Sequence, residues 1–186
     1  MDTIERISGW DHSHRETSEV LGVRIIREQV HQQSTGKHET WRFVDFGHGV
    51  HVFAMTPDRN VLLVSQYRPP VRAYTLELPG GGAPESLSEP EYMERAQREL
   101  QEETGYTGEL EFLYRYHPMA GLTSFSIRLY LARSVEPVKV HGTGPEWNEI
   151  ERVIKRPVDT VIREGKAGAY ADGILTTACF FVEQRL

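Results

Sequence analysis

The chain is short of the residues that would cross-link it or anchor it elsewhere. It has one cysteine, Cys179, so no disulfide can form within its 186 residues. The apolar neighbours of that cysteine predict a buried, inert thiol. No hydrophobic run approaches the roughly 20 residues of a membrane span, the first residues do not resemble a signal peptide, and the eight histidines lack the His/Cys spacing of a zinc site. We therefore expect a cytoplasmic protein without disulfides or structural zinc.

Positive charge is also in short supply. Lys and Arg number 21 against 27 Asp and Glu, which gives a net charge of −6. An acidic chain does not attract nucleic acid through its overall charge. If it handles phosphates, a metal and a few local arginines must supply the attraction. Hydrophobic residues make up 39% and charged residues 26%, which suits one globular domain with a core and a small extension.

One helix is strongly marked in the middle of the chain. Ser88 can act as its N-cap, with Glu91 three residues later as in a capping box. Pro90 falls in the first turn, where its missing N–H is not needed. Gly105 suits the left-handed position that ends a helix. These signals predict a helix of about four turns between Ser88 and Gly105.

The predicted helix has an apolar stripe and an acidic flank. At the helical period, Met93, Ala96 and Leu100 share one face. The flank beside them carries three glutamates at i, i+3 and i+4, namely Glu99, Glu102 and Glu103. Carboxylates this close repel one another, and a divalent cation bound by oxygen ligands would remove the repulsion. The alternative is a solvated acidic face, which most charge runs are.

The residues around these glutamates favour the metal site. The run from Arg98 to Tyr106 reads R-E-L-Q-E-E-T-G-Y. It contains every fixed position of the second half of the Nudix box, G-x5-E-x7-R-E-U-x-E-E-x-G-U, where U is a bulky apolar residue. The chain thus resembles the Nudix hydrolases. The resemblance implies that Glu99, Glu102 and Glu103 bind magnesium, and that Arg98 orients Glu102.

The first half of the box departs from the family pattern. Pro84 and Pro90 stand where the box has its glycine and its first glutamate. Gly81 can serve as the box glycine if a few residues are inserted before the helix. The displaced glutamate, which in the family mainly supports the helix arginine, would then be one of Glu85, Glu89 and Glu91.

The resemblance implies an α/β fold, a Nudix α/β/α sandwich with a mixed β-sheet, over residues 49–186. An N-terminal antiparallel β extension, residues 1–48, would precede it. Alternating patterns at 20–30 and 41–46 predict the hairpin of this extension. Residues 1–18 are polar and predict either a frayed terminus or an arm that docks elsewhere. In the ADP-ribose and nucleotide-sugar pyrophosphatases such a small sheet commonly builds a homodimer, and the alternative is a hairpin on a monomer.

The remaining elements follow from pattern. Strands are predicted at 50–55, 61–66, 110–116 and 125–132, and helices at 157–164, ended by Gly165, and 171–183. The four apolar residues at 61–64 predict a strand that is buried on both faces.

Two further stretches resemble the same pyrophosphatase subgroup. Residues 66–69 read Q-Y-R-P, and residues 77–81 read E-L-P-G-G, similar to the family's E-L-P-A-G. The resemblance implies that Arg68 and Glu77 line the substrate site and that a backbone carbonyl near Gly80 helps to hold metal. The alternatives are a surface salt bridge for the arginine and a strand-end carboxylate for the glutamate.

The loop at 117–124 resembles the substrate-facing stretch S-P-G-x-S/T-[SD]-E of ADP-ribose pyrophosphatases. It implies that Gly121 and Thr123 contact substrate. However, the family's glutamate falls at Phe125, and its serine falls near Met119. ADP-ribose is therefore the leading substrate, with GDP-mannose or another nucleotide sugar as the alternative.

A catalytic base and a base-stacking residue are also expected. The glycine- and acid-rich loop at 142–151 resembles the loop that supplies a catalytic glutamate in related enzymes. By register Glu146 is the first candidate and Glu149 the second, and both could instead be solvated loop acids. For stacking on a nucleobase the candidates are Trp41, Phe43, Tyr67 and Trp147, each of which could instead pack in a core or an interface.

Together these features predict a Mg²⁺-dependent pyrophosphatase acting on a nucleotide sugar, with Mn²⁺ as a possible substitute and a homodimer as the assembly. The expected products are a nucleoside monophosphate and a sugar phosphate. The alternatives are a Nudix hydrolase of nucleoside triphosphates, dinucleoside polyphosphates or capped RNA, and a Nudix module that binds without catalysis.

Overall fold

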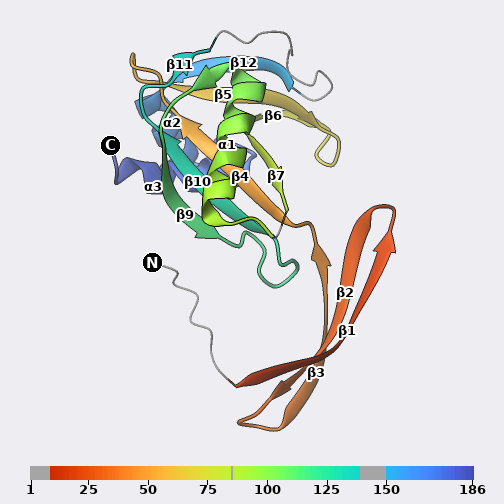
Figure 1. Ribbon diagram of the computed structural model, residues 1–186. Helices are drawn as coiled ribbons and strands as arrows, with labels where there is room; N and C mark the ends of the chain where they lie inside the picture. Colours follow the sequence, from red (N-terminus) through yellow and green to blue (C-terminus); the bar gives the residue numbers. More distant parts are fainter. Residues whose placement is uncertain (1–8, 85, 139–149) are drawn as a thin grey trace. The chain divides into compact units, whose positions relative to one another are not determined.

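The computed structural model describes residues 9–84, 86–138 and 150–186 (Figure 1). Its contacts divide the chain into two compact units: unit 1, residues 1–47 with 117–126, and unit 2, residues 48–116 with 127–186. The elements are β1 (Trp10–Val20), β2 (Val23–Gln32), β3 (Lys37–Asp45), β4 (His48–Ala54), β5 (Asn60–Arg68), β6 (Ala73–Glu77), β7 (Gly80–Ala83), α1 (Glu89–Thr104), β8 (Tyr106–Thr107), β9 (Leu110–Tyr116), β10 (Ser126–Ala132), β11 (Glu136–Pro137), β12 (Ile150–Pro157), α2 (Val158–Lys166) and α3 (Gly173–Glu183).

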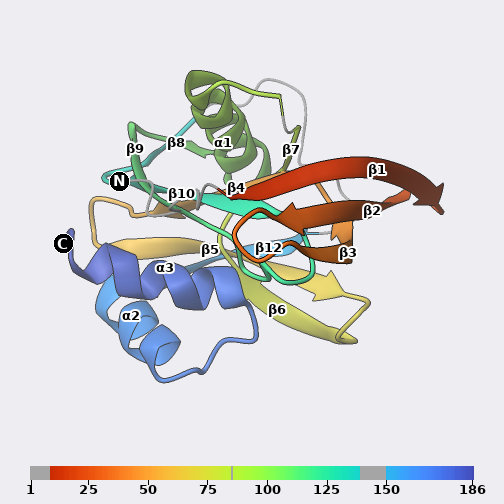
Figure 2. The same ribbon diagram turned by 90° about the horizontal axis from the view of Figure 1, so that it is seen from below.

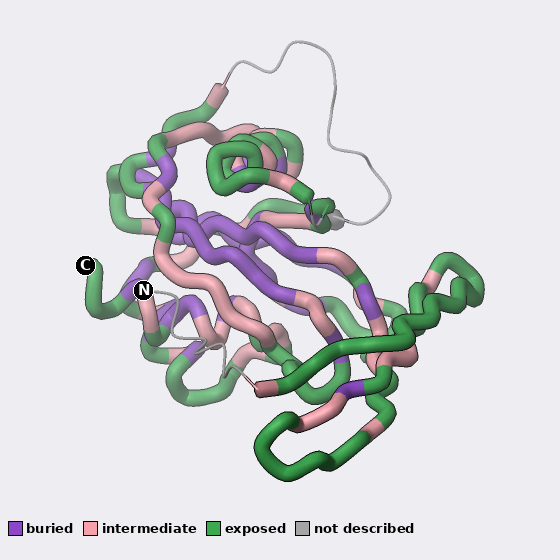
Figure 3. The backbone as a smooth tube through the Cα atoms, turned by 60° about the horizontal axis from the view of Figure 1, so that its bottom comes forward, coloured by how far each residue is buried: buried purple, intermediate pink, exposed green. Residues whose placement is uncertain are grey.

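Unit 1 is an antiparallel sheet in the order β1-β2-β3. The segment 117–126 joins it through the N–H of Val44, which donates to the carbonyl of Leu122 at 3.0 Å. Ile26 and Val30 are its buried apolar side chains, whereas every residue of β1 is exposed (Figure 3). The unit therefore has a small core and one long exposed edge strand.

The prediction for this region had too few strands. Residues 10–20, expected to be a frayed terminus or an arm, form β1, and the expected strand at 20–30 is divided by the turn at Leu21 and Gly22. Polar residues dominate β1, and its pairing with β2 supplies the backbone hydrogen bonds that hydrophobic patterning did not signal. The strand expected at 41–46 begins earlier, at Lys37, directly after the turn at Gly36.

Unit 2 contains the larger core. Its strands form a sheet in the order β7-β4-β10-β9, a second in the order β12-β5-β6, and the short pair β11-β8. β4 and β10 are buried along their whole length, and residues 61–64 of β5 are fully buried as expected (Figure 3). Figure 2 shows α1 on one side of these strands and α2 and α3 on the other. This confirms the expected α/β/α sandwich.

Helix α1 has the predicted ends. Ser88 and Glu91 form the capping box, and Gly105 ends the helix in the left-handed conformation, with φ of 73°. The predicted apolar stripe is partly wrong, because the buried residues are Tyr92, Ala96, Glu99 and Leu100, whereas Met93 is exposed. The buried face is thus rotated toward Glu99, and one of the three predicted metal ligands lies against the strands.

The C-terminal helices differ from expectation at one glycine. Gly165 does not end α2, which runs to Lys166. A Cβ at position 165 would lie 2.5 Å from Sγ of Cys179. The glycine therefore allows α2 and α3 to approach closely, and the cysteine thiol is buried as predicted. None of the helices in the described ranges has the length and hydropathy needed to cross a membrane.

Candidate functional site

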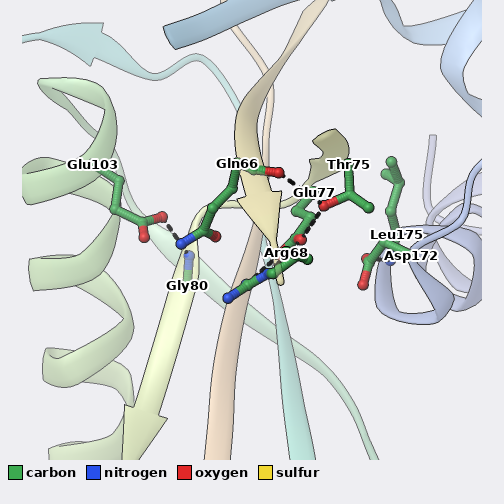
Figure 4. A network of polar contacts seen from close by, with 8 residues as sticks. All are labelled: Gln66, Arg68, Thr75, Glu77, Gly80, Glu103, Asp172 and Leu175. Atoms are coloured by element: carbon green, nitrogen blue, oxygen red, sulfur yellow. Dashed lines mark hydrogen bonds and ion pairs between the residues drawn. The ribbon is translucent and has the colours of Figure 1, made fainter. Parts of the chain in front are cut away.

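Two predicted substrate residues of unit 2 are bound to each other. Arg68 donates from Nε to Oε1 of Glu77 at 2.7 Å and from Nη2 to Oε2 at 2.5 Å. Thr75 donates from Oγ1 to the same Oε1 at 2.5 Å (Figure 4). Burial opposes ionisation of Glu77, but the hydrogen bonds from Arg68 and Thr75 outweigh it and lower its pKa. The β5–β6 hairpin thus holds an ionised carboxylate beneath an arginine.

Glu103 faces the same region from α1. Its Oε2 accepts a hydrogen bond of 2.8 Å from the backbone N–H of Gly80 (Figure 4). Burial raises the pKa of Glu103 to about 8, against the hydrogen bond from Gly80, and the nearby carboxylates of Glu99 and Glu77 add to the rise. The positive charge of Arg68 opposes this rise without cancelling it, so the negative charge of Glu103 is only partly compensated.

Glu99 lies one turn earlier on α1 and is buried. A Cβ at Gly81 would lie 2.7 to 2.9 Å from the carboxylate atoms of Glu99, so a larger residue at this position would force the end of that side chain to move. Arg95 forms an ion pair with Oε1 of Glu99, yet this buried oxygen accepts no well-formed hydrogen bond. Burial raises the pKa of Glu99 in spite of Arg95. The structure therefore gives a physical reason for a glycine at position 81.

The third glutamate and the helix arginine are more exposed. Glu102 and Arg98 both lie on the solvent side of α1. No ion pair joins them among the described residues, so the predicted orienting contact between Arg98 and Glu102 is absent from this structure. The arginine that contacts a site glutamate is Arg95, whose i, i+4 spacing from Glu99 was visible in the sequence.

This arrangement fits a divalent cation. Carboxylate and backbone carbonyl oxygens are the donors that magnesium accepts. Glu99 is buried and Glu103, one turn further along α1, is half-buried, both with raised pKa values, and one oxygen of Glu99 lacks a hydrogen bond. Within the described ranges, however, no three histidine, cysteine or acidic side chains already converge on one point. Metal binding would therefore require small side-chain movements and oxygens from substrate or water.

Two candidates for the displaced box glutamate, Glu89 and Glu91, have other partners at the start of α1. Glu89 makes an ion pair of 2.7 Å with Nη2 of Arg128, whose guanidinium lies 3.5 Å from the ring centre of Tyr92. Glu91 is committed to the capping box with Ser88. Neither contacts Arg98, whereas Glu85 lies outside the described residues. Glu89 thus joins the helix to β10 and does not support the helix arginine.

The predicted substrate loop belongs to unit 1. Gly121 and Thr123 line a cavity of about 420 Å³ together with the aromatic side chains of Trp10, Trp41 and Phe43. The cavity also contains His12, whose Nδ1 lies 3.0 Å from Oε2 of Glu28. Two of the four candidate stacking residues, Trp41 and Phe43, therefore share one cavity with both predicted loop residues.

The other candidates are distributed differently. Tyr67 is exposed on β5, where its ring packs edge-to-face against Tyr74 with centroids 5.3 Å apart. Glu146, Glu149 and Trp147 lie outside the described residues. The candidate bases therefore remain predictions from sequence.

Three residues of the site were missed by sequence reasoning. Thr75 was detectable, since Thr-x-Glu places both side chains on one face of a strand. His51 is buried on β4 against Gly80, and burial lowers its pKa to about 4. Asp172 caps α3 by accepting from the N–H of Leu175 at 2.6 Å, and burial raises its pKa to about 6. No local pattern marks the last two. Only the fold brings His51 against Gly80 and Asp172 to the region of Arg68 and Glu77, where Figure 4 shows Asp172.

Comparison with known proteins agrees with this fold. The NUDIX domain family model matches residues 45–172. The chain is 28% identical over 150 residues to a methanol dehydrogenase activator of Bacillus methanolicus, covering 79% of each chain. It is 35% identical over 125 residues to an ADP-sugar pyrophosphatase of Mus musculus, covering 59% of this chain and 56% of that one. It is 33% identical over 101 residues to an ADP-ribose pyrophosphatase of Bacillus subtilis, covering 54% and 53%.

The fold has a solved counterpart. The crystal structure of an ADP compounds hydrolase superposes with a TM-score of 0.76 at 18% identity, covering 96% of this chain and 94% of that one. The protein therefore belongs to the Nudix family. Within the family it falls among the hydrolases that resemble ADP-ribose and ADP-sugar pyrophosphatases, although the chain spans only about half the length of the two pyrophosphatases it matches.

Proposed function

We propose that this protein hydrolyses the pyrophosphate bond of a nucleotide sugar, with ADP-ribose as the leading substrate and AMP and ribose 5-phosphate as products. One observation carries the proposal. Two carboxylates with raised pKa values, the buried Glu99 and the half-buried Glu103, lie against the glycine strand and close to the Arg68–Glu77 pair. Such an arrangement is costly in a folded protein unless a cation and an anionic ligand use it.

The carboxylates would hold magnesium, with manganese as a possible substitute. Glu99, Glu103 and the carbonyl of Gly80 are the inner ligands we propose, and the exposed Glu102 would approach from the solvent side. When bound, the metal neutralises charge on the pyrophosphate and lowers the pKa of the attacking water. The raised pKa of Glu103 means that metal binding would compete with a proton for this carboxylate.

The chain's own groups would orient the substrate and accept the proton. Arg68 presents a guanidinium whose plane is set by its two hydrogen bonds to Glu77, so its remaining edge can face a phosphate oxygen. Water adds to one phosphorus as the bridging P–O bond breaks, and a carboxylate takes the proton of that water. Glu146 or, second, Glu149 is the base we propose from sequence, and both lie outside the described residues.

The aromatic cavity of unit 1 would suit a flat ring such as a nucleobase. Trp41 and Phe43 offer flat faces for stacking, and Gly121 and Thr123 on the neighbouring loop leave room and a hydroxyl. We also propose a homodimer, supported by the fully exposed edge strand β1. Light scattering at micromolar concentration should give twice the mass of 21.3 kDa, and a monomer at that concentration would refute the dimer.

Two other functions have some support. The change at Phe125 in the substrate loop favours GDP-mannose or another nucleotide sugar over ADP-ribose. The name of the relative from Bacillus methanolicus describes activation of another enzyme, which favours a regulatory Nudix module. The raised pKa values of Glu99 and Glu103 fit a metal-dependent reaction better than regulation alone, so hydrolysis remains the better proposal.

The test is magnesium-dependent turnover across a panel of ADP-ribose, GDP-mannose, ADP-glucose, UDP-glucose, ATP and diadenosine polyphosphates. We expect AMP from ADP-ribose and no pyrophosphate from ATP. A Glu103→Gln preparation is the matched blank for contaminating hydrolases. If the wild-type protein turns over nothing with magnesium or manganese, hydrolysis is excluded and the regulatory function becomes the better explanation.

A further inference from the structure

The hydroxyl of Thr75 has a position that the proposed function does not yet use. Thr75 is buried on β6, two residues before Glu77 and therefore on the same face of the strand. Its Oγ1 lies 2.5 Å from Oε1 of Glu77 and 3.3 Å from the carbonyl oxygen of Gln66. One hydroxyl proton can be donated to only one of these acceptors, and the closer, ionised carboxylate is the stronger acceptor.

The hydrogen bond from Thr75 restricts the orientation of the Glu77 carboxylate. Arg68 donates from Nε and Nη2 to the two carboxylate oxygens of Glu77. A pair joined only by these two hydrogen bonds can rotate together about the side-chain bonds of the glutamate. Thr75 fixes Oε1 from a β-branched side chain with restricted rotation on a paired strand. The position of Oε1 is therefore set independently of the arginine.

The arginine is the more exposed partner. The side chain of Arg68 is 42% exposed, whereas that of Glu77 is 8% exposed. A guanidinium at the surface loses rotamer freedom when it binds an anion, and a fixed partner removes part of that loss beforehand. The orientation of Arg68 is thus determined at its buried end, by the carboxylate and by the hydroxyl behind it (Figure 4).

We propose that Thr75 is a positioning residue for substrate binding, which acts through Glu77 to hold the Arg68 guanidinium ready for a phosphate of the nucleotide sugar. This inference rests on the proposed function, because it assigns the anion to the pyrophosphate. It predicts an effect on affinity and little effect on the chemical step, since Arg68 contacts the phosphate both before and during reaction.

The decisive comparison uses three variants of nearly equal size. Thr75→Val removes only the hydroxyl, and Thr75→Ser retains it. Thr56→Val is the matched control, because Thr56 is also a buried threonine of unit 2 whose Oγ1 bonds a backbone carbonyl, that of Asn60, at 3.1 Å. We expect Thr75→Val to raise KM roughly tenfold, the scale of a lost hydrogen bond to a charged group, with kcat within about twofold. Thr75→Ser and Thr56→Val should keep KM within about threefold of wild type.

A second cycle tests whether the effect passes through the glutamate. In a Glu77→Gln background, Thr75→Val should add no further change in KM, because the acceptor that transmits the effect has been altered. The same tenfold loss in that background would overturn the proposal, as would a KM for Thr75→Val equal to that of Thr56→Val. If Thr75→Val does not fold, Thr75→Ala provides a second variant without the hydroxyl.

Calorimetric binding of AMP and of ribose 5-phosphate separates this inference from the proposed function. These ligands need no turnover, so the comparison holds even if the wild-type protein hydrolyses none of the panel. Weaker binding of either ligand to Thr75→Val, by about tenfold relative to Thr56→Val, supports the positioning role. Equal affinity of both proteins for both ligands refutes it.

Discussion

Glu89 begins helix α1 and Glu103 lies in its last turn, and the fold treats the two carboxylates in opposite ways. Glu89 has a bidentate cationic partner in Arg128, and the hydrogen bonds from that arginine lower its pKa against a smaller effect of burial. Glu103 has one backbone N–H, and burial raises its pKa to about 8. One end of the helix holds a compensated charge, and the other an only partly compensated one.

The difference separates the carboxylate that stabilises the helix from the carboxylates that we propose for metal binding. Arg128 is buried in β10 and stacked on Tyr92, so its pairing with Glu89 joins the first turn of α1 to the sheet. Glu99 and Glu103 weaken the metal-free fold, because charge in a poorly solvated place is unfavourable. Natural proteins tolerate such local cost mainly where function requires it. The comparison therefore assigns stability to one end and chemistry to the other.

The largest expected effect is on turnover. Glu103→Gln should reduce kcat for the nucleotide sugar by roughly 1,000-fold, the upper range for losing one preorganised group that stabilises charge. The fold should persist, because the amide can still accept from the N–H of Gly80. Steady-state kinetics and circular dichroism measure the two quantities. Unchanged activity would remove Glu103 from the metal site.

A substitution at the start of α1 should instead change the stability of the fold. Glu89→Ala leaves the buried guanidinium of Arg128 without its carboxylate, which is itself 65% exposed, and we expect a loss of about 2 kcal/mol in the free energy of unfolding, the scale of a buried donor left without its partner. Glu94→Ala, at an exposed position of the same helix, is the control and should change little. Urea titrations followed by circular dichroism compare the two. Equal midpoints would show that the start of α1 depends on other contacts.

Magnesium should stabilise the protein only through the C-terminal end of α1, which carries Glu103. At a concentration of 100 times Kd, a ligand of the folded state adds about 2.7 kcal/mol. For a domain of this size that corresponds to a rise in Tm of roughly 5 to 10 °C. Scanning calorimetry of wild type and Glu103→Gln, each with magnesium and with a chelator, makes the comparison. A rise of the same size in the variant would place the cation elsewhere.

The smallest effect concerns a carboxylate outside α1, that of the half-buried Asp172. The pKa of Asp172 is raised from 3.8 to about 6 by burial, so the folded protein binds more protons than the unfolded chain between these values. Its contribution to stability therefore falls as pH rises from about 4 to about 6. Over this window the free energy of unfolding of Asp172→Asn should rise relative to that of wild type by about 2 kcal/mol at most, given 1.36 kcal/mol for each pKa unit.

The control for this prediction is Asp172→Ala, which also removes the acceptor for the N–H of Leu175 and should be less stable than Asp172→Asn at every pH. Urea midpoints from pH 4 to pH 8 provide the measurement. A constant difference between Asp172→Asn and wild type would mean that Asp172 titrates normally in the folded protein.

Much of the fold and part of the site could be predicted because their signals are local. Capping residues, a left-handed glycine and helical spacing determine α1 almost to the residue. A continuous apolar run identifies buried β5. The metal-ligand candidates on α1 share one motif, so a single helix brings Glu99 and Glu103 together without reference to the rest of the chain. The resemblance to the Nudix family rests on this same stretch.

Other features could not be predicted because their partners are distant in sequence. Arg128 follows Glu89 by 39 positions, and the segment 117–126 belongs to unit 1 although more than 70 residues separate it from β3. β1 has little hydrophobic pattern, so its strand conformation depends on pairing with β2. The rotation of α1 that buries Glu99 and exposes Met93 depends on which strands cover the helix.

The sequence by itself determined the family, the helix and the acidic residues that we propose as metal ligands, since those follow from short-range spacing and chemistry. Only the tertiary structure decided which carboxylates are compensated. Arg128, Thr75 and Gly80 each reach their glutamate from another strand position, and burial by the surrounding elements sets whether the charge is stabilised or strained. Solvation and long-range pairing are properties of the packed molecule, which is why the same residue type lies ionised with a partner at one end of α1 and with a pKa of about 8 at the other.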